Sequence, residues 1–331
     1  MVNGHLAIDL VELMAATPWG SVASVDVDGV DEAEFVQRWA AASGNYVLMV
    51  HADRVELLRG IPPDPLEALA PERRPGHRLW VYTNFNCNLA CDYCCVESSP
   101  RADPRAFGVA EFRDLVAEAA ACGVRELFLT GGEPFMLVDL DERICVGVAA
   151  MPTTVLTNAM LWRGERLRLL GRLPRDGLTL QISVDSPDPG LHDLHRGSGS
   201  FERALAGIEV ALALGFRVRI AATLGDDVGD GEARLRSWFD RLGLAEDCLV
   251  VRRVARQGAA NSGLVMSRSS LLPEICVTAD GLWWHPVAAI DPAMRVSASW
   301  RPLAERIGEV SREYRGYRLA GEIAASSFPC A

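Results

Sequence analysis

Three cysteines lie close together in the chain, with three and then two residues between them: Cys87, Cys91 and Cys94. Thiolate sulfur is the ligand that iron–sulfur clusters prefer, and a loop with these short gaps can enclose one cluster from three sides. Because a [4Fe–4S] cube has four irons, three thiolates leave one iron open to a small molecule. The spacing therefore predicts that these cysteines bind such a cluster.

Two other uses of the cysteines fit less well. A structural zinc site takes four protein ligands, and Cys95 directly follows Cys94, so the two side chains hardly reach the same metal. The 331 residues contain 9 cysteines, which is sparse for a disulfide framework, and no signal peptide is expected at the start. The iron–sulfur interpretation is favoured over both.

A second motif, Gly131-Gly132-Glu133-Pro134, follows an apolar stretch at residues 126–130. Glycines allow close approach of the backbone and unusual dihedral angles. Glu133 can accept a hydrogen bond from an ammonium group, and Pro134 stiffens the turn. The segment is weak evidence alone, but beside an open iron it indicates a site for a small molecule with an amino group.

Together the two motifs resemble those of the radical S-adenosylmethionine (SAM) enzymes. In that family the open iron chelates the amino and carboxylate groups of SAM, and one electron from the cluster splits SAM into methionine and a 5′-deoxyadenosyl radical. The resemblance implies an enzyme with a [4Fe–4S] cluster and SAM as cofactors. It also implies a flavodoxin- or ferredoxin-type electron donor as a partner.

The resemblance extends to polar residues downstream. Thr157-Asn158 is similar to the family's Thr-Asn-Gly segment, with Ala159 in place of glycine. Residues 192–201 resemble the H-D-x-x-R-G…S-F segment of peptide-maturing radical SAM enzymes and of molybdenum cofactor cyclases; its arginine can pair with a carboxylate. A strand-end turn and a helix-capping loop are the plainer alternatives. The residues expected to bind SAM are Tyr93, Gly131, Gly132, Glu133, Pro134, Asn158, Ser183, Asp185 and Arg196.

These motifs sit on alternating strands and helices. Strands are predicted at residues 78–85, 126–130, 153–157, 178–184, 217–223 and 248–254, and helices at 110–121, 201–215 and 232–242. Such alternation predicts a parallel sheet with the candidate site residues at the carboxyl ends of its strands. The resemblance implies an open barrel of six β/α units over about residues 78–256. The fold class is α/β: a partial (β/α)6 TIM-like barrel with an N-terminal α+β module and a C-terminal extension.

The predicted domains are residues 1–76, 77–256 and 257–331. The first is expected to contain strands at 21–27, 46–51 and 54–59, a helix at 31–42 and a linker at 61–75. It carries no catalytic motif, and a packing module is favoured over a recognition appendage. The last contains Asp280-Gly281 in a stretch that resembles the hairpin of SPASM or twitch extensions. There His285-Pro286 replaces the usual cysteine. Only Cys276 and Cys330 remain in this region, with Cys248 further back, and an auxiliary cluster needs three or four ligands, so such a cluster is disfavoured but left open. Trp283, Trp284 and His285 could line a substrate pocket.

Some radical SAM epimerases use a cysteine thiol to return a hydrogen atom to the substrate radical. The resemblance makes Cys95, Cys248 and Cys276 candidates for this catalytic role, against the alternative of inert buried thiols. Arg252, Arg253 and Arg256 form a basic cluster at the end of the sixth predicted strand. They could bind an anionic group of the substrate or of SAM, or form surface ion pairs.

A net charge of −11 disfavours broad contact with nucleic acid, and no apolar run of 18 residues is present to span a membrane. A cytoplasmic location is expected, which suits an oxygen-sensitive cluster. The preferred function is hydrogen abstraction from a natural-product precursor, either a peptide or an amino-sugar, for epimerisation, oxidation or crosslinking. One alternative is a MoaA-like rearrangement of a small molecule or nucleotide, although the C-terminal cysteine triad of that group is missing. The other is a non-enzymatic iron–sulfur scaffold or sensor.

Overall fold

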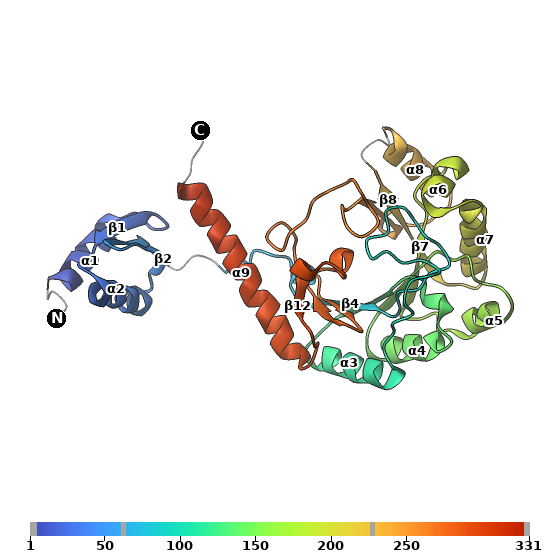
Figure 1. Ribbon diagram of the computed structural model, residues 1–331, viewed down its shortest axis with the longest axis horizontal. Helices are drawn as coiled ribbons and strands as arrows, with labels where there is room; N and C mark the ends of the chain where they lie inside the picture. Colours follow the sequence, from blue (N-terminus) through green and yellow to red (C-terminus); the bar gives the residue numbers. More distant parts are fainter. Residues whose placement is uncertain (1–4, 61–63, 226–228, 328–331) are drawn as a thin grey trace. The chain divides into compact units, whose positions relative to one another are not determined.

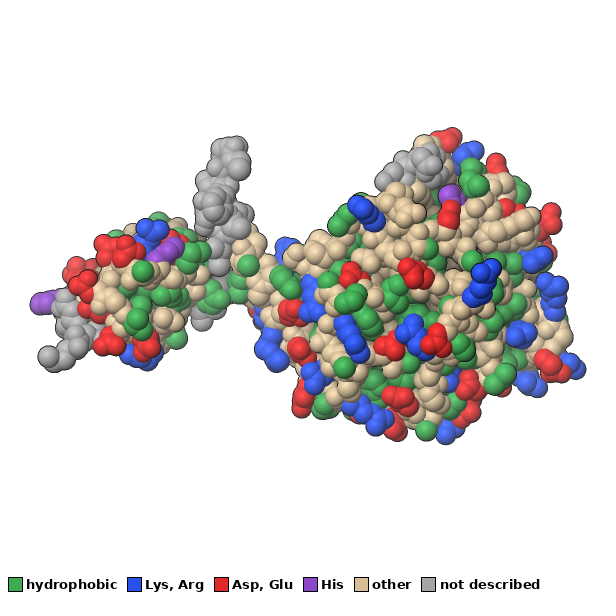
Figure 2. All heavy atoms as spheres, viewed as in Figure 1, with side chains coloured by type: hydrophobic (Ala, Val, Ile, Leu, Met, Phe, Trp, Pro, Cys, Tyr) green, Lys and Arg blue, Asp and Glu red, His purple; other side chains and the backbone are tan. Residues whose placement is uncertain are grey.

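The computed structural model describes residues 5–60, 64–225 and 229–327. The chain forms two compact units, Met1–Leu69 with Arg318–Ala331, and Ala70–Tyr317. No helix in the described ranges is both long enough and apolar enough to cross a bilayer. On the visible face of the larger unit, arginine and acidic side chains are interspersed (Figure 2).

The smaller unit is an antiparallel sheet packed against helices. Its strands follow the order β1-β3-β2, and every second residue of β1 is buried. Leu10, Val36 and Leu57 are fully buried in the core between sheet and helices. The three predicted strands and the predicted helix are confirmed, whereas α1 was not predicted. The elements are α1 (Leu6–Ala16), β1 (Val22–Asp26), α2 (Val30–Ser43), β2 (Tyr46–Val50) and β3 (Arg54–Leu58).

The larger unit is built on a nine-stranded sheet in the order β12-β11-β10-β4-β5-β6-β7-β8-β9. From β4 to β9 all neighbours are parallel, and each of the six strands lies where the sequence predicts one. The end strands β9 and β12 do not pair with each other, so the barrel is open, as expected. The parallel strands are β4 (Arg78–Tyr82), β5 (Glu126–Thr130), β6 (Thr153–Thr157), β7 (Leu178–Ser183), β8 (Arg217–Leu224) and β9 (Leu249–Arg253).

Helices cover the outer face of the parallel strands (Figure 1). The parallel strands face the helices on one side and the lumen of the barrel on the other. In β5, four of the five residues are therefore buried, and its middle three are apolar. Helices α3, α7 and α8 were predicted, and the others were not. The helices are α3 (Val109–Ala121), α4 (Leu140–Ala150), α5 (Gly164–Arg172), α6 (Pro189–Arg196), α7 (Ser200–Ala213) and α8 (Gly231–Asp240). Short 3-10 helices are η1 (Pro71–Arg73), η2 (Pro134–Met136), η3 (Glu246–Cys248), η4 (Pro286–Ala288) and η5 (Pro292–Met294).

The residues after 256 extend the barrel sheet. The hairpin predicted around Asp280-Gly281 is present, and its first strand pairs in parallel with β4. Of the three residues that could line a substrate pocket, Trp283 and Trp284 are buried and do not line the main cavity, whereas His285 does. The elements are β10 (Cys276–Thr278), β11 (Gly281–Trp283), β12 (Arg295–Ser297) and α9 (Leu303–Ser327).

Candidate active site

A cavity of about 760 Å³ occupies the lumen of the open barrel. This is the size of a site for a small molecule. Cys87, Cys91 and Cys94 line one end of it, together with Gly131 and Gly132. The two motifs that the sequence singles out therefore meet at the carboxyl edge of the parallel sheet, where α/β barrels place their chemistry.

The cysteine loop supplies three thiols and backbone donors directed at them. The amide of Leu89 donates to Cys87 Sγ at 3.4 Å, and the amide of Ser98 donates to Cys94 Sγ at 3.2 Å. Burial raises the pKa of Cys87 to about 12 and that of Cys91 to about 11. A cationic iron centre would offset this cost, and hydrogen bonds to sulfur are a usual feature of cluster sites.

Within the described ranges, no three Cys, His, Asp or Glu side chains are arranged to hold a single metal ion. The three thiols do line the same cavity, and three thiolates from one loop are the donors that suit a [4Fe–4S] cluster with one iron left open. By its chemistry, the donor set fits such a cluster.

The two glycines bring the loops after β4 and β5 into backbone contact. A Cβ on Gly132 would lie 2.1 Å from the carbonyl oxygen of Asn86, and one on Gly131 would lie 2.5 Å from Asn84 Oδ1. Gly131 also has φ +153°, which few side chains tolerate. Only glycine fits here, and the exposed backbone faces the cavity, where a bound molecule can approach it closely.

Glu133 is buried behind this wall and joins β5 to β6. Its Oε1 accepts from Thr157 Oγ1 at 2.8 Å and from the amide of Phe135 at 3.1 Å. Its Oε2 accepts from the amide of Asn158 at 2.8 Å. Burial raises the pKa of Glu133 to about 7, although these hydrogen bonds lower it in part. The carboxylate fixes the position of the two strand ends, and its expected role as acceptor for the SAM ammonium group stays a prediction.

A buried ion pair between Arg196, which lines the cavity, and Asp185, which does not, is a second polar feature of the site. Arg196 donates through Nε to Asp185 Oδ2 at 2.6 Å and through Nη2 to Oδ1 at 3.1 Å. The Tyr93 hydroxyl also donates to Asp185, as does the amide of Thr223 in β8. Burial favours protonation of Asp185, but the Arg196 charge and the hydrogen bonds from Arg196, Tyr93 and Thr223 together outweigh it, so the pKa of Asp185 is lowered. The predicted pairing of Arg196 with a carboxylate is therefore confirmed.

The rest of the H-D-x-x-R-G…S-F segment holds this ion pair in place. His192 Nδ1 accepts the Asp185 amide at 3.2 Å, and its ring packs edge-on to Phe201. The Asp193 carboxylate accepts the amide of Phe201 at 2.8 Å and so caps the start of α7. The sequence pattern indicated Arg196, but the parts played by His192 and Asp193 needed the structure.

The predicted residues divide by their access to the cavity. Among the residues expected to bind SAM, Glu133, Pro134 and Asp185 stand behind its wall. Those that line it are Tyr93, Gly131, Gly132, Asn158, Ser183 and Arg196. Of the candidate hydrogen donors, Cys95 lines the cavity, with its Sγ 3.9 Å from the Tyr82 hydroxyl, whereas Cys248 and Cys276 do not. Cys330 lies outside the described residues.

Comparison with known proteins agrees with this geometry. A family model described as "Radical SAM superfamily" matches residues 81–236. A GTP 3',8-cyclase of Stenotrophomonas maltophilia is 36% identical over 167 residues, covering 47% of this chain and 48% of that protein. The sporulation killing factor maturation protein SkfB of Bacillus subtilis is 30% identical over 146 residues, covering 44% and 35%. Streptococcus suis SuiB bound to S-adenosylmethionine has a TM-score of 0.56 at 16% identity, covering 74% of this chain and 68% of that one.

The open β/α barrel with a three-thiol loop at its carboxyl edge defines an iron–sulfur protein of the α/β class. More particularly, residues 81–236 match the model of the radical SAM superfamily. The cofactors of that superfamily, a [4Fe–4S] cluster and SAM, are those expected from the motifs. The chain spans about half or less of the length of the curated relatives that it matches.

Proposed function

We propose that the protein is a radical SAM enzyme that abstracts a hydrogen atom from a natural-product precursor. When bound, the cluster and SAM supply a 5′-deoxyadenosyl radical for this step. The observation that carries the proposal is the shared cavity: the three thiols and the Gly131-Gly132 backbone line one end, and the lumen behind them is open. A scaffold or sensor has no use for a second binding space beside its cluster.

The roles of the chain's own residues follow from their positions. Cys87, Cys91 and Cys94 would hold the cluster, and the backbone at Gly131 and Gly132 would contact SAM. Asn158, Ser183, Tyr93 and Arg196 would complete the SAM site along the same wall, and Asp185 would orient the last two. The lumen below this wall would take the substrate and exclude water from the radical.

Cys95 is the candidate for returning a hydrogen atom when the outcome is epimerisation. Its thiol faces the cavity, and burial raises its pKa to about 12, so the S–H bond is retained. Transfer of the hydrogen atom would form a C–H bond and leave a thiyl radical on Cys95. A flavodoxin- or ferredoxin-type donor would then restore the thiol with one electron, together with one proton.

A peptide is favoured as the substrate. SkfB is named for maturation of a sporulation killing factor, and SuiB has been crystallised with its precursor peptide SuiA. The second candidate, rearrangement of a nucleotide, is supported by the similarity to the GTP 3',8-cyclases.

The test is anaerobic reconstitution with iron and sulfide, followed by assay of 5′-deoxyadenosine with SAM and dithionite. About four irons per chain and steady formation of deoxyadenosine are expected. Combined replacement of Cys87, Cys91 and Cys94 by alanine should abolish both. Cys145→Ala is the matched control, because Cys145 is an exposed thiol on α4. A cluster that never cleaves SAM would reject the enzyme and leave the iron–sulfur scaffold.

A further inference from the structure

The lumen contains a group of polar side chains that the radical SAM motifs do not include. Gln181 on β7 and Arg219 on β8 are partners in the strand register, and Arg252 lies on β9. All three line the cavity. We call Gln181, Arg219 and Arg252 the inner cluster.

Gln181 is buried with its amide unsatisfied. Only 1% of the residue is exposed, and among the described residues neither Nε2 nor Oε1 has a hydrogen-bond partner. A buried amide without partners destabilises the folded protein. The group faces a cavity that can hold a ligand, so a ligand with both a donor and an acceptor would satisfy it.

No described carboxylate pairs with Arg219 or Arg252, since the acids that line the cavity are already engaged. Glu126 accepts from Arg78 Nε at 3.2 Å, and Asp247 pairs with Arg217 at 3.0 Å. These two carboxylates pair with other arginines, so neither forms an ion pair with Arg219 or Arg252.

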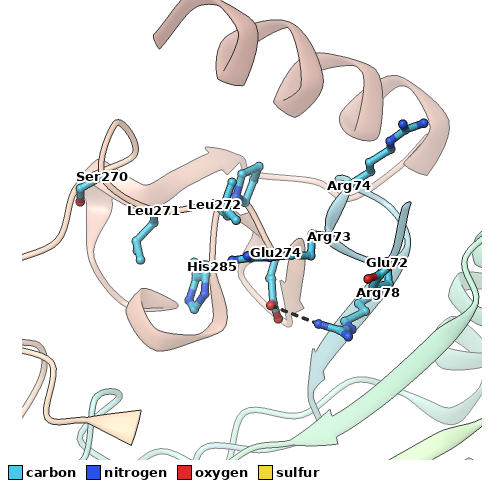
Figure 3. A pocket seen from close by; sticks show the side chains of 10 residues that line it. Glu72, Arg73, Arg74, Arg78, Ser270, Leu271, Leu272, Glu274 and His285 are labelled. Carbon is cyan, nitrogen blue, oxygen red and sulfur yellow. Dashed lines mark ion pairs between the residues drawn. The ribbon is translucent and has the colours of Figure 1, made fainter. Parts of the chain in front are cut away.

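Glu274 is the acid that acts most strongly on Arg252, but it is held elsewhere. Figure 3 shows its carboxylate directed at Arg78, at 3.6 Å, in the wall of a neighbouring cavity of about 300 Å³. It also accepts from Trp80 Nε1 at 2.6 Å. Arg252 itself packs over the Trp80 ring and is exposed to solvent, with the cavity as one of its surroundings.

We propose that the inner cluster binds a substrate segment in which a carboxylate lies close to an amide group, as at an acidic residue or the carboxyl terminus of a peptide. Guanidinium groups bind planar carboxylates through paired hydrogen bonds. The Gln181 amide is complementary to a peptide group, because it donates to C=O and accepts from N–H. A phosphate offers only acceptors and leaves Oε1 unsatisfied, and an amino-sugar brings a cation toward two unpaired cations. The inference rests on the proposed function, and among the candidate substrates it favours a peptide.

The test measures binding to the reconstituted protein in the presence of saturating SAM, by anaerobic calorimetry. The probes are N-acetyl-glycylglycine, its uncharged C-terminal amide, and GMP. The carboxylate probe is expected to bind at least about tenfold more tightly than the amide probe and than GMP, because only the carboxylate can make a charge-assisted bidentate contact beside the Gln181 amide. This series needs no variant and so does not depend on any variant folding.

Variants then locate the site. Arg219→Met and Arg252→Met should each weaken the carboxylate probe about tenfold and leave the amide probe little changed, whereas Gln181→Met should weaken both. Arg236→Met is the control, because Arg236 is exposed on α8 and pairs with Glu232; it should change neither.

Three results would overturn the inference: equal binding of the charged and uncharged probes, tighter binding of GMP, or competition between SAM and the carboxylate probe. The last would mean that the arginines bind the carboxylate of SAM. Deoxyadenosine formation in the same wild-type sample separates the two proposals. If the protein prefers the carboxylate probe but does not cleave SAM, the proposed enzyme is rejected and the binding site is kept. If it cleaves SAM but does not distinguish the probes, the enzyme is kept and the binding site is rejected.

Discussion

Two groups of polar residues at the cavity differ in their hydrogen bonding. At the rim, defined by Glu133, Asp185, Arg196 and Tyr93, the buried polar side chains are bonded to one another or to the backbone. In the inner cluster, the Gln181 amide and two guanidinium groups have no such partners in the described chain. The rim residues are thus satisfied within the protein, whereas the inner cluster has groups that the proposed ligand would satisfy.

If this contrast is correct, changes at the rim should lower the stability of the protein, and removal of an unsatisfied group from the inner cluster should raise it. The free energy of unfolding in urea measures both effects.

The largest effect is expected from Arg196→Met. The variant leaves Asp185 buried without its cation, which should lower the free energy of unfolding by about 3–5 kcal/mol. Arg168→Met removes an exposed pair with Glu165 and should cost less than about 1 kcal/mol. Equal losses for the two variants would show that the rim ion pair is not special.

Gly132→Ala should cost about 1–3 kcal/mol, because its Cβ overlaps the carbonyl oxygen of Asn86 and the two loops must separate. SAM binding, measured on the reconstituted protein, should weaken as well. The control is Gly171→Ala on α5, where a Cβ meets no atom within 4 Å. That change should raise the free energy of unfolding by up to about 1 kcal/mol. A stable Gly132→Ala variant with normal SAM affinity would contradict the tight contact.

His192 should make the rim sensitive to acid. Burial lowers its pKa to about 4, so between the unfolded pKa of about 6.5 and pH 4 the unfolded state binds more protons. The free energy of unfolding therefore falls as the pH falls through this window, by about 2 kcal/mol at pH 5.

The measurement compares wild type with His192→Asn at pH 7 and pH 5, and the variant should lose less stability on acidification. Glu133 changes the pH dependence of stability in the opposite direction, because its pKa is raised in the folded state. Both proteins contain Glu133, so its effect cancels when they are compared. The same pH dependence in both proteins would exclude His192 as the cause.

The smallest effect, and the one of opposite sign, is expected from Gln181→Met. Replacing the unsatisfied amide with an apolar chain of similar size should raise the free energy of unfolding by about 1 kcal/mol. At the rim, Thr157→Val keeps the volume but removes the hydrogen bond to Glu133, and it should lower the free energy of unfolding by about 1–2 kcal/mol. If both substitutions lower the free energy of unfolding equally, the rim and the inner cluster do not differ in how well their polar groups are satisfied.

The sequence by itself determined the cysteine triplet, the glycine turn and the six parallel strands. These features are local: thiol spacing within one loop fixes which side chains can share a cluster, and apolar runs of about five residues between polar segments identify buried strands. The resemblance to radical SAM enzymes rests on the same local motifs, which is why residues 81–236 were recognisable.

The tertiary structure decided which side chains reach the cavity and which of them lie near one another. It placed Glu133 and Asp185 behind the cavity wall and brought Cys95, but neither Cys248 nor Cys276, to the lumen. It also joined Gln181, Arg219 and Arg252, which come from three strands and have no shared motif. The physical reason is that a parallel barrel brings together residues far apart in the chain, and whether a polar side chain has a partner depends on strand register and helix packing.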